Sequence, residues 1–279
     1  MNTIQLKAKI YRGYDADFTL EVPADGYLGW DTRTVEINPE KTAVVVMHAW
    51  NVGTPEEYPG VFRANEYVLR SYEVCKKVFP ELLETVRNSP LRLYHVVGGP
   101  DYYSSYPGYQ YVLKTLKEYN EQHGIGAVQP KPDLCEPDDA YRKIKEMITY
   151  DASYGKHNME DIHRSIKIRN FADEAMPIGD EPIAATTEEL FALCKKEGIN
   201  HLIYTGFALN CCLQVSPCGM VDMFRKGLIC SVIEDATVAM ETKESIRGEW
   251  NKHGQLYMIS TLYGLIFRSK DVIGALKGL

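Results

Sequence analysis

Cys212 lies where a cysteine could act as a nucleophile. It comes after the apolar run 202–205, which predicts a buried strand, and after Gly206, which is expected to end that strand. Asn210 caps helices well, so we expect a helix to begin at Cys211 or Cys212. Unpaired amides at a helix start favour a thiolate and can stabilise an oxyanion. The alternative is that both cysteines are small apolar packing residues.

The loop over residues 205–213 reads Thr-Gly-Phe-Ala-Leu-Asn-Cys-Cys-Leu. It resembles the loop Thr-Gly-Val-Ala-Thr-Asn-x-Cys-Val of the isochorismatase-like cysteine hydrolases, the superfamily of nicotinamidases and N-carbamoyl amidohydrolases. A match without gaps places the family nucleophile on Cys212, and the resemblance covers residues 42–276. It implies a cis peptide bond between Phe207 and Ala208, and an oxyanion hole formed by the amides of Ala208 and Cys212.

The resemblance also implies an Asp-Lys-Cys triad, from which this chain departs at two positions. His48 stands where the family has its aspartate, directly after the predicted strand 42–47. A histidine can still serve as a base toward a thiol, because its ordinary pKa is about 6.5; the alternative is a hydrogen-bonded core histidine. No lysine lies at the family position near residues 178–180, but Lys167 and Arg169 lie upstream and could reach the site.

Polar and aromatic side chains follow two predicted strands at their carboxyl ends, where α/β proteins form ligand sites. The candidate substrate-pocket residues are Trp50, Asn51, Asp101, Tyr102 and Tyr103. Tyrosines in this position could stack on a planar ligand. Tyrosines gathered at a subunit contact are the alternative interpretation.

His157, Asp161 and His163 are close in sequence and could suggest a metal site. Their spacing does not place both histidines on one helical face, so we interpret them as solvated loop residues. Some relatives bind a metal through residues after the first strand, but residues 52–70 contain no histidine here. Seven cysteines without a CxxC pair also argue against a zinc site or a disulfide framework. We therefore predict neither a metal nor a cofactor.

Strands and helices alternate along most of the chain, which predicts an α/β fold. We expect a single domain over residues 42–279, with a parallel sheet, helices on both faces and the three-layer, Rossmann-like arrangement of the isochorismatase-like family. Residues 1–41 are expected to form an N-terminal arm or hairpin. A long helix is predicted over 64–86, and 151–185 are expected to be irregular but functional, since long loops within a domain are seldom empty.

The composition narrows the class of partner. The formal net charge of −7 argues against nucleic acid or an anionic membrane as the main partner. No apolar run has the length of a membrane span, and the N-terminus lacks a signal-peptide core, so we expect a cytoplasmic location. We expect a small-molecule substrate and a homo-oligomer, either a dimer or a tetramer.

Two functional hypotheses follow. The first is a cysteine hydrolase that acts on an amide, carbamoyl or related C–N bond of a small molecule, with an acyl-enzyme on Cys212 and His48 as base. The second is a non-catalytic ligand-binding or structural protein on the same scaffold that has lost the triad. The fold alone does not choose between them, because function depends on the site.

Overall fold

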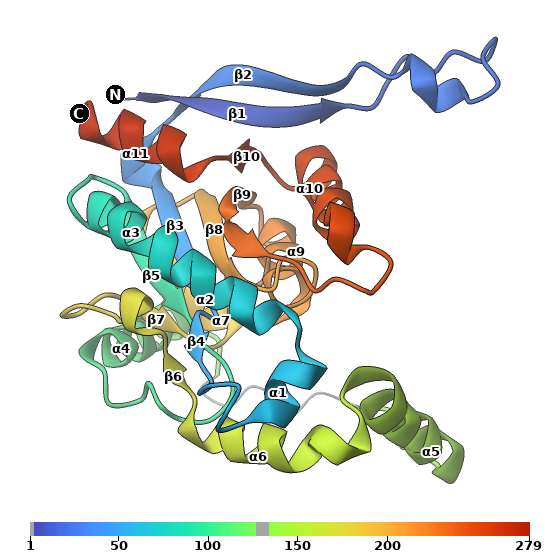
Figure 1. Cartoon of the computed structure of the whole chain (residues 1–279). Coiled ribbons are helices and arrows are strands. Elements are labelled where there is room, and N and C mark those ends of the chain that lie inside the picture. The colour runs from blue at the N-terminus through green and yellow to red at the C-terminus, as the bar shows by residue number, and fades with distance from the viewer. Residues whose placement is uncertain (1–2, 127–133) are drawn as a thin grey trace.

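A mostly parallel eight-stranded sheet forms the centre of the computed structural model, which describes residues 3–126 and 134–279 (Figure 1). The strand order is β2-β1-β10-β9-β8-β3-β5-β7, and all neighbouring pairs from β10 to β7 are parallel. The strands are β1 (Ile4–Arg12), β2 (Gly29–Ile37), β3 (Thr42–Met47), β5 (Arg92–Val96), β7 (Ile183–Ala184), β8 (His201–Phe207), β9 (Ile229–Val238) and β10 (Ile266–Phe267). The predicted α/β fold with a parallel sheet is confirmed.

Strands β1 and β2 form an antiparallel hairpin, and β1 also pairs antiparallel with β10. The hairpin therefore extends the main sheet at one edge, and the loop that joins its strands projects from that edge (Figure 1). The alternating burial of the first residues of β1 fits a strand with one face on the core and one toward solvent.

Helices cover both faces of the sheet. Every residue of β3 and of β8 is buried, as expected for central parallel strands. Successive side chains of β3 point to opposite faces, so Val44 and Val46 pack in one core cluster and Val45 in the other. The first cluster includes side chains of α2 (Tyr67–Lys77), α3 (Phe79–Arg87) and α11 (Ser269–Lys277). The second includes side chains of α4 (Pro107–Gln122), α7 (Thr187–Glu197), α9 (Met220–Arg225) and α10 (Trp250–Leu262).

The prediction of a single helix over residues 64–86 is wrong. The structure has two helices there, α2 and α3, while α1 (Pro59–Ala64) ends at the first residue of the predicted range. The break between α2 and α3 falls at Val78, and Pro80 lies in the first turn of α3. Proline has no backbone N–H and clashes with the preceding turn, so it starts a new helix here and does not continue the old one.

The expectation of irregular structure over residues 151–185 is also wrong in part. The segment contains α6 (Met159–Ile168) and strand β6 (Asn170–Phe171), which pairs with β4 (Trp50–Asn51) in a separate two-stranded sheet. Helix α6 packs on α1, where the Gly60 amide donates to Asp161 Oδ2 at 2.7 Å. These contacts are distant in sequence, so local pattern could not indicate them.

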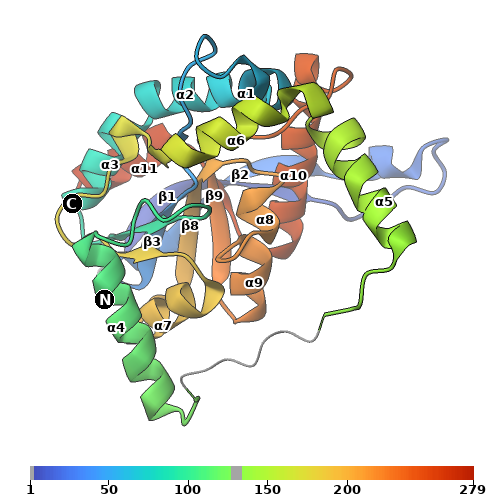
Figure 2. The same ribbon diagram turned by 90° about the horizontal axis from the view of Figure 1, so that it is seen from below.

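Helix α5 (Asp139–Met147) and the π-helical turn after it, Ile148–Ser153, stand apart from the sheet in both views (Figures 1 and 2). All nine residues of α5 are exposed. None of the described helices is both long enough and apolar enough to span a membrane. Short 3-10 turns lie at Pro23–Gly26, Pro39–Lys41, Lys156–Asn158, Asp173–Ala175 and Ile246–Gly248.

Candidate active site

The loop after β8 is anchored to both neighbouring strands. Gly206 pairs with Met47 and adopts φ +105°, and a Cβ there would lie 1.9 Å from the Met47 carbonyl oxygen, so only glycine fits. Thr205 Oγ1 donates to the Val45 carbonyl at 3.0 Å, and Thr237 Oγ1 donates to the Gly206 carbonyl at 2.6 Å. These contacts fix the backbone that leads to Cys212.

The prediction that Asn210 caps the following helix is wrong. Its side chain instead forms two hydrogen bonds with the Met240 backbone: Nδ2 donates to the carbonyl and Oδ1 accepts from the amide, both at 2.9 Å. Helix α8 (Cys212–Val215) begins after Cys211, which provides no side-chain cap. Asn210 thus ties the nucleophile loop to the segment between β9 and α10. Cys212 remains the first residue of the helix.

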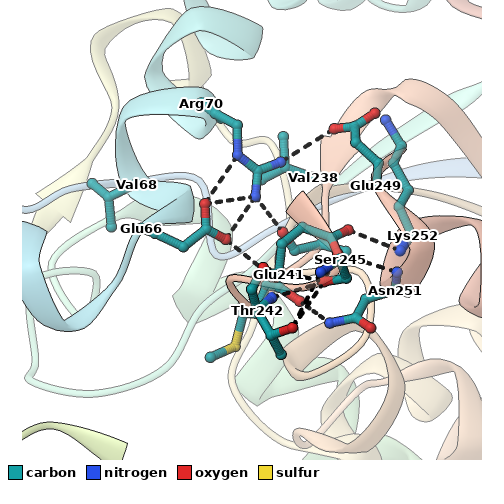
Figure 3. Close-up of polar contacts among 12 residues, drawn as sticks. Glu66, Val68, Arg70, Val238, Glu241, Thr242, Ser245, Glu249, Asn251 and Lys252 are labelled. Atoms are coloured by element: carbon teal, nitrogen blue, oxygen red, sulfur yellow. Dashed lines mark hydrogen bonds and ion pairs between the residues drawn. The ribbon is translucent and has the colours of Figure 1, made fainter. Parts of the chain in front are cut away.

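Glu241, next to Met240, holds this segment against α10 (Figure 3). Its buried carboxylate accepts hydrogen bonds from the amides of Asn251 and Lys252, at 3.1 and 3.0 Å, and from Ser245 Oγ. A carboxylate at the first turn of a helix satisfies unpaired amides and interacts favourably with the helix dipole. The contact therefore fixes the backbone to which Asn210 is bonded.

The same segment is joined to α2 (Figure 3). The Glu241 amide donates to Glu66 Oε1 at 2.7 Å, and Arg70 donates both to Glu66, at 2.7 Å, and to the Ala239 carbonyl, at 2.7 Å. Tyr67 directly follows Glu66, so this network also sets the position of the first residue of α2.

Two backbone amides of the nucleophile loop lie beside Cys212. The peptide bond between Phe207 and Ala208 is cis, at the position that the family resemblance implies. The Ala208 carbonyl accepts from the amides of Cys211 and Leu213, both at 3.1 Å. The amides of Ala208 and Cys212 themselves donate to no acceptor within residues 3–126 and 134–279. They are therefore available to an oxygen atom of a ligand.

His48 sits at the carboxyl end of β3 in a constrained position. Its backbone adopts φ +52°, which is uncommon for a residue other than glycine, and its amide donates to the Val96 carbonyl at 3.0 Å. The buried ring stacks on Trp50 with centroids 4.3 Å apart. Its Nδ1 has no partner in the part of the chain that the structure describes.

His48 influences the acidity of the Cys212 thiol. Hydrogen bonds from Cys211 and then from His48, together with positive charge on the His48 ring, lower the pKa of Cys212 below its ordinary value. A hydrogen bond from Ser216 acts in the same direction, while burial alone would raise this pKa. The two residues expected to form the catalytic pair are thus brought together, and the thiolate of Cys212 is favoured.

Arg169 brings a second positive charge to the site. Because β6 pairs with β4, its guanidinium lies over the Trp50 ring, 4.0 Å from the centroid. Burial lowers the pKa of Arg169, whereas Tyr102, Tyr67 and Cys212 act in the opposite direction and raise it. It forms no ion pair with any described carboxylate. Of the two upstream cations considered from the sequence, Arg169 reaches the site, whereas the other, a lysine at 167, is exposed.

The structure divides the predicted pocket residues. Trp50 and Tyr102 belong to the site, and the Trp50 indole N–H donates to the Tyr102 hydroxyl at 2.7 Å. The Asn51 side chain is exposed and accepts from the Gly53 amide, and Asp101 is exposed and accepts from the Ser104 amide. Both therefore stabilise turns outside the site.

Tyr103 also lies elsewhere. Its ring packs edge-on against Tyr109, with centroids 4.9 Å apart, in a cluster with Val97, Phe171 and Ile183. The tyrosines after β5 thus build a local aromatic core, and among the three predicted pocket residues of this loop Tyr102 is the one that bonds to Trp50.

Sequence analysis missed two tyrosines. Burial raises the pKa of Tyr67, and Cys212 raises it further. Tyr154 acts in the same direction on the pKa values of both Tyr67 and Arg169. Tyr67 falls within the helix predicted over residues 64–86, and no local signal marks Tyr154.

Residues predicted to be peripheral have structural contacts. Asp161 lies on α6 and not in a loop, and Asp161 Oδ1 accepts from Arg164 at 3.0 Å, while His163 is exposed. In residues 3–126 and 134–279 there is no group of three or more His, Cys, Asp or Glu side chains that could hold a metal ion.

The segment near the family's lysine position is fixed by Glu181. Glu181 accepts from Arg87 Nε at 2.6 Å, from the Ile178 amide at 3.0 Å, and pairs with His95 Nε2 at 2.9 Å. Asp180 is exposed. A surface cavity of about 920 Å³ is lined by Arg87, Glu181 and the first residues of β5, at the opposite end of that strand from the site.

No protein-family model matches the chain, and no curated protein sequence matches it significantly. Several solved structures match it. A cysteine hydrolase from Pseudomonas syringae pv. phaseolicola is 14% identical with a TM-score of 0.48, over 87% of this chain and 95% of that one. An isochorismatase-like hydrolase from Alkaliphilus metalliredigens is 15% identical with a TM-score of 0.45, over 84% and 97%.

An isochorismatase family protein from Burkholderia thailandensis is 14% identical with a TM-score of 0.45, over 86% of this chain and 97% of that one. In each case the match covers nearly the full length of the solved structure.

Proposed function

We propose that this protein is an isochorismatase-like hydrolase that cleaves an amide, carbamoyl or related C–N bond of a small molecule through an acyl-enzyme on Cys212. The observation that carries the proposal is the pairing of Met47 with Gly206, which brings His48 to the loop of Cys212, a thiol whose pKa is lowered by Cys211 and His48. The amides of Ala208 and Cys212, which donate to no acceptor among the described residues, add to it.

In the first half of the reaction His48 accepts the thiol proton, and the Cys212 thiolate attacks the carbonyl carbon of the substrate. The oxygen atom gains negative charge and accepts hydrogen bonds from the amides of Ala208 and Cys212, which donate to no described protein acceptor. The intermediate then expels the amine as the C–N bond breaks, and His48 returns its proton to the leaving nitrogen.

In the second half His48 removes a proton from water, which attacks the thioester carbonyl. The bond to sulfur breaks, the acid leaves, and the proton returns to Cys212. Arg169 keeps a positive charge beside the site throughout, because a guanidinium stays protonated in proteins, and no described carboxylate pairs with it. This places a cation near the thiolate without the lysine of the family triad.

The alternative is a binding protein on the same scaffold. Replacement of the family aspartate by His48 and the lack of the family lysine favour it. Under this alternative no compound would be turned over, and His48→Ala and Cys212→Ser would leave ligand affinity nearly unchanged.

The test is amine release from a panel of primary amides, N-carbamoyl compounds and ureas. Wild-type protein should turn over at least one member. His48→Ala should lower kcat/KM by about 10²- to 10⁴-fold, the usual contribution of a general base. Cys212→Ala should abolish turnover, whereas Cys211→Ala should keep measurable turnover at a reduced rate, because the nucleophile remains but loses a hydrogen bond that favours its thiolate. Turnover that survives Cys212→Ala would refute the proposed nucleophile.

A further inference from the structure

We propose that Arg169 is the binding site for a carboxylate carried by the substrate, so that the protein acts on amide or carbamoyl compounds bearing a carboxylate group. The inference that this ligand is a substrate rests on the proposed hydrolase function. The anion site itself does not, because it is built from side chains whose positions are independent of any turnover.

The guanidinium of Arg169 is held in one orientation. It stacks on the Trp50 ring at 4.0 Å, and it passes so close to Gly99 that a Cβ on that residue would lie 2.5 Å from Nη1. Trp50 is fixed in turn by its bond to Tyr102 and by its stacking on His48. A planar donor that is already oriented loses little conformational entropy when it binds an anion.

The charge of Arg169 is uncompensated, unlike that of comparable arginines. Arg70 pairs with Glu66 at 2.7 Å, and Arg87 pairs with Glu181 at 2.6 Å. Arg169 is partly buried and has no such partner, and its buried Nε has no hydrogen-bond acceptor among residues 3–126 and 134–279. A desolvated cation is costly unless paired, so the site is ready for an anionic ligand.

The surroundings favour a carboxylate. The groups with the largest electrostatic influence on Arg169 are the phenols of Tyr102, Tyr67 and Tyr154 and the thiol of Cys212. Their O–H and S–H groups could donate hydrogen bonds to a bound oxygen atom. A guanidinium matches the two oxygen atoms of a carboxylate in plane, with two parallel N–H···O hydrogen bonds.

The site lies next to the proposed base. Arg169 and His48 both contact the Trp50 ring, with the guanidinium 4.0 Å and the His48 ring centroid 4.3 Å from the Trp50 centroid. Both groups therefore lie beside one side chain of the candidate site. A ligand held by its carboxylate at Arg169 would present a separate carbonyl group to Cys212.

Two alkylating reagents of the same size test this without a known substrate. Iodoacetate and iodoacetamide both place an iodomethyl carbon before the thiolate, which displaces iodide and forms a thioether. Only iodoacetate carries a carboxylate. The ratio of their rates at Cys212, measured by peptide mass spectrometry, reports anion binding, because any change in thiolate reactivity affects both reagents.

In wild-type protein the iodoacetate rate should saturate with concentration. Arg169→Gln should lower the ratio of iodoacetate to iodoacetamide rates by about 10- to 100-fold, the factor that one charge-assisted contact supplies. Arg169→Lys should lower this ratio less, because it keeps the positive charge. Lys167→Gln is the matched control, since it removes an exposed positive charge two residues away, and it should leave the ratio unchanged.

An equal ratio in wild type, Arg169→Gln and Lys167→Gln would overturn the carboxylate site. The iodoacetamide rate shows in the same samples whether each variant keeps an intact, reactive Cys212. If the ratio falls as expected but no amide or carbamoyl compound is turned over, the anion site stands and the hydrolase proposal fails. If turnover is found but is indifferent to a substrate carboxylate, the hydrolase stands and this inference fails.

Discussion

At the scale of the residue, a few contacts set the chemistry of one thiol. Cys212 is flanked by His48, Cys211 and Ser216, each of which favours its thiolate. The roles of Cys212 and His48 could be predicted from the sequence, because both residues follow strands at their carboxyl ends. Cys212 also lies in the loop 205–213, which resembles the family's nucleophile loop. It could not predict Tyr67 or the contact of Arg169, because these depend on the packing of segments far apart in the chain.

The seven cysteines should differ strongly in reactivity. Burial raises the pKa values of Cys75 and Cys230 to about 12, and those of Cys194 and Cys218 are also raised by burial. With limiting iodoacetamide near neutral pH, peptide mapping should find Cys212 alkylated first. Cys135 is the internal control, because it is exposed. Faster labelling of Cys135 than of Cys212 would contradict the assignment.

At the scale of the element, backbone geometry places the reacting groups. The strand ends of β3 and β8 could be predicted from apolar runs, and the pairing of Met47 with Gly206 brings His48 and the nucleophile loop together. The short pairing of β4 with β6 could not be predicted, since two-residue strands carry almost no pattern. Yet that pairing positions Arg169.

Gly206→Ala should destabilise the fold and abolish activity. The added Cβ would meet the Met47 carbonyl at 1.9 Å in a backbone conformation that side chains rarely adopt. We expect a loss of about 2–4 kcal/mol in the free energy of unfolding, measured by urea titration. Gly254→Ala is the control: it lies within α10 with open space around it, and should stabilise by about 0.5–1 kcal/mol. Equal stability of Gly206→Ala and wild type would show that the loop is not so constrained.

Glu181 should make stability depend on acid pH. Burial acts to raise its pKa, but hydrogen bonds from His95 and Arg87 lower it from 4.5 to about 2. Its folded pKa is below the unfolded value, so its contribution is present above about pH 4.5 and is lost as pH falls toward about 2. Glu181→Gln should therefore cost about 2 kcal/mol near neutral pH and progressively less in acid.

Urea titrations of wild type and Glu181→Gln across this pH range would measure the effect. Asp180→Asn is the matched control, because Asp180 is exposed and adjacent. A stability difference between wild type and Glu181→Gln that does not change with pH would contradict the role assigned to the carboxylate.

At the scale of the whole molecule, the alternation of strands and helices was enough to predict the α/β class and the parallel sheet. It did not show that the N-terminal hairpin joins the same sheet through β10, because antiparallel edge pairing leaves no mark in the local sequence. The domain boundary at residue 42, the cytoplasmic location and the homo-oligomer stay predictions.

Chelators should leave both fold and activity unchanged. The proposed reaction uses a thiol, an imidazole and backbone amides, and the described residues offer no cluster that could hold a metal ion. Elemental analysis of purified protein and turnover after dialysis against EDTA would measure this. Stoichiometric zinc or iron, or activity lost with EDTA and restored by a metal, would contradict it.

The central claim is that His48 activates Cys212, and the pH dependence of Cys212 alkylation tests it most directly. In wild type the iodoacetamide rate should stay high well below pH 9, the ordinary pKa of the thiol, because the pKa of Cys212 is lowered. His48→Ala and the bulkier His48→Gln should both move the profile toward higher pH and slow alkylation at about pH 6 by about tenfold for each pKa unit restored. A wild-type profile like that of an ordinary thiol, or superimposable profiles for wild type and both variants, would contradict the account.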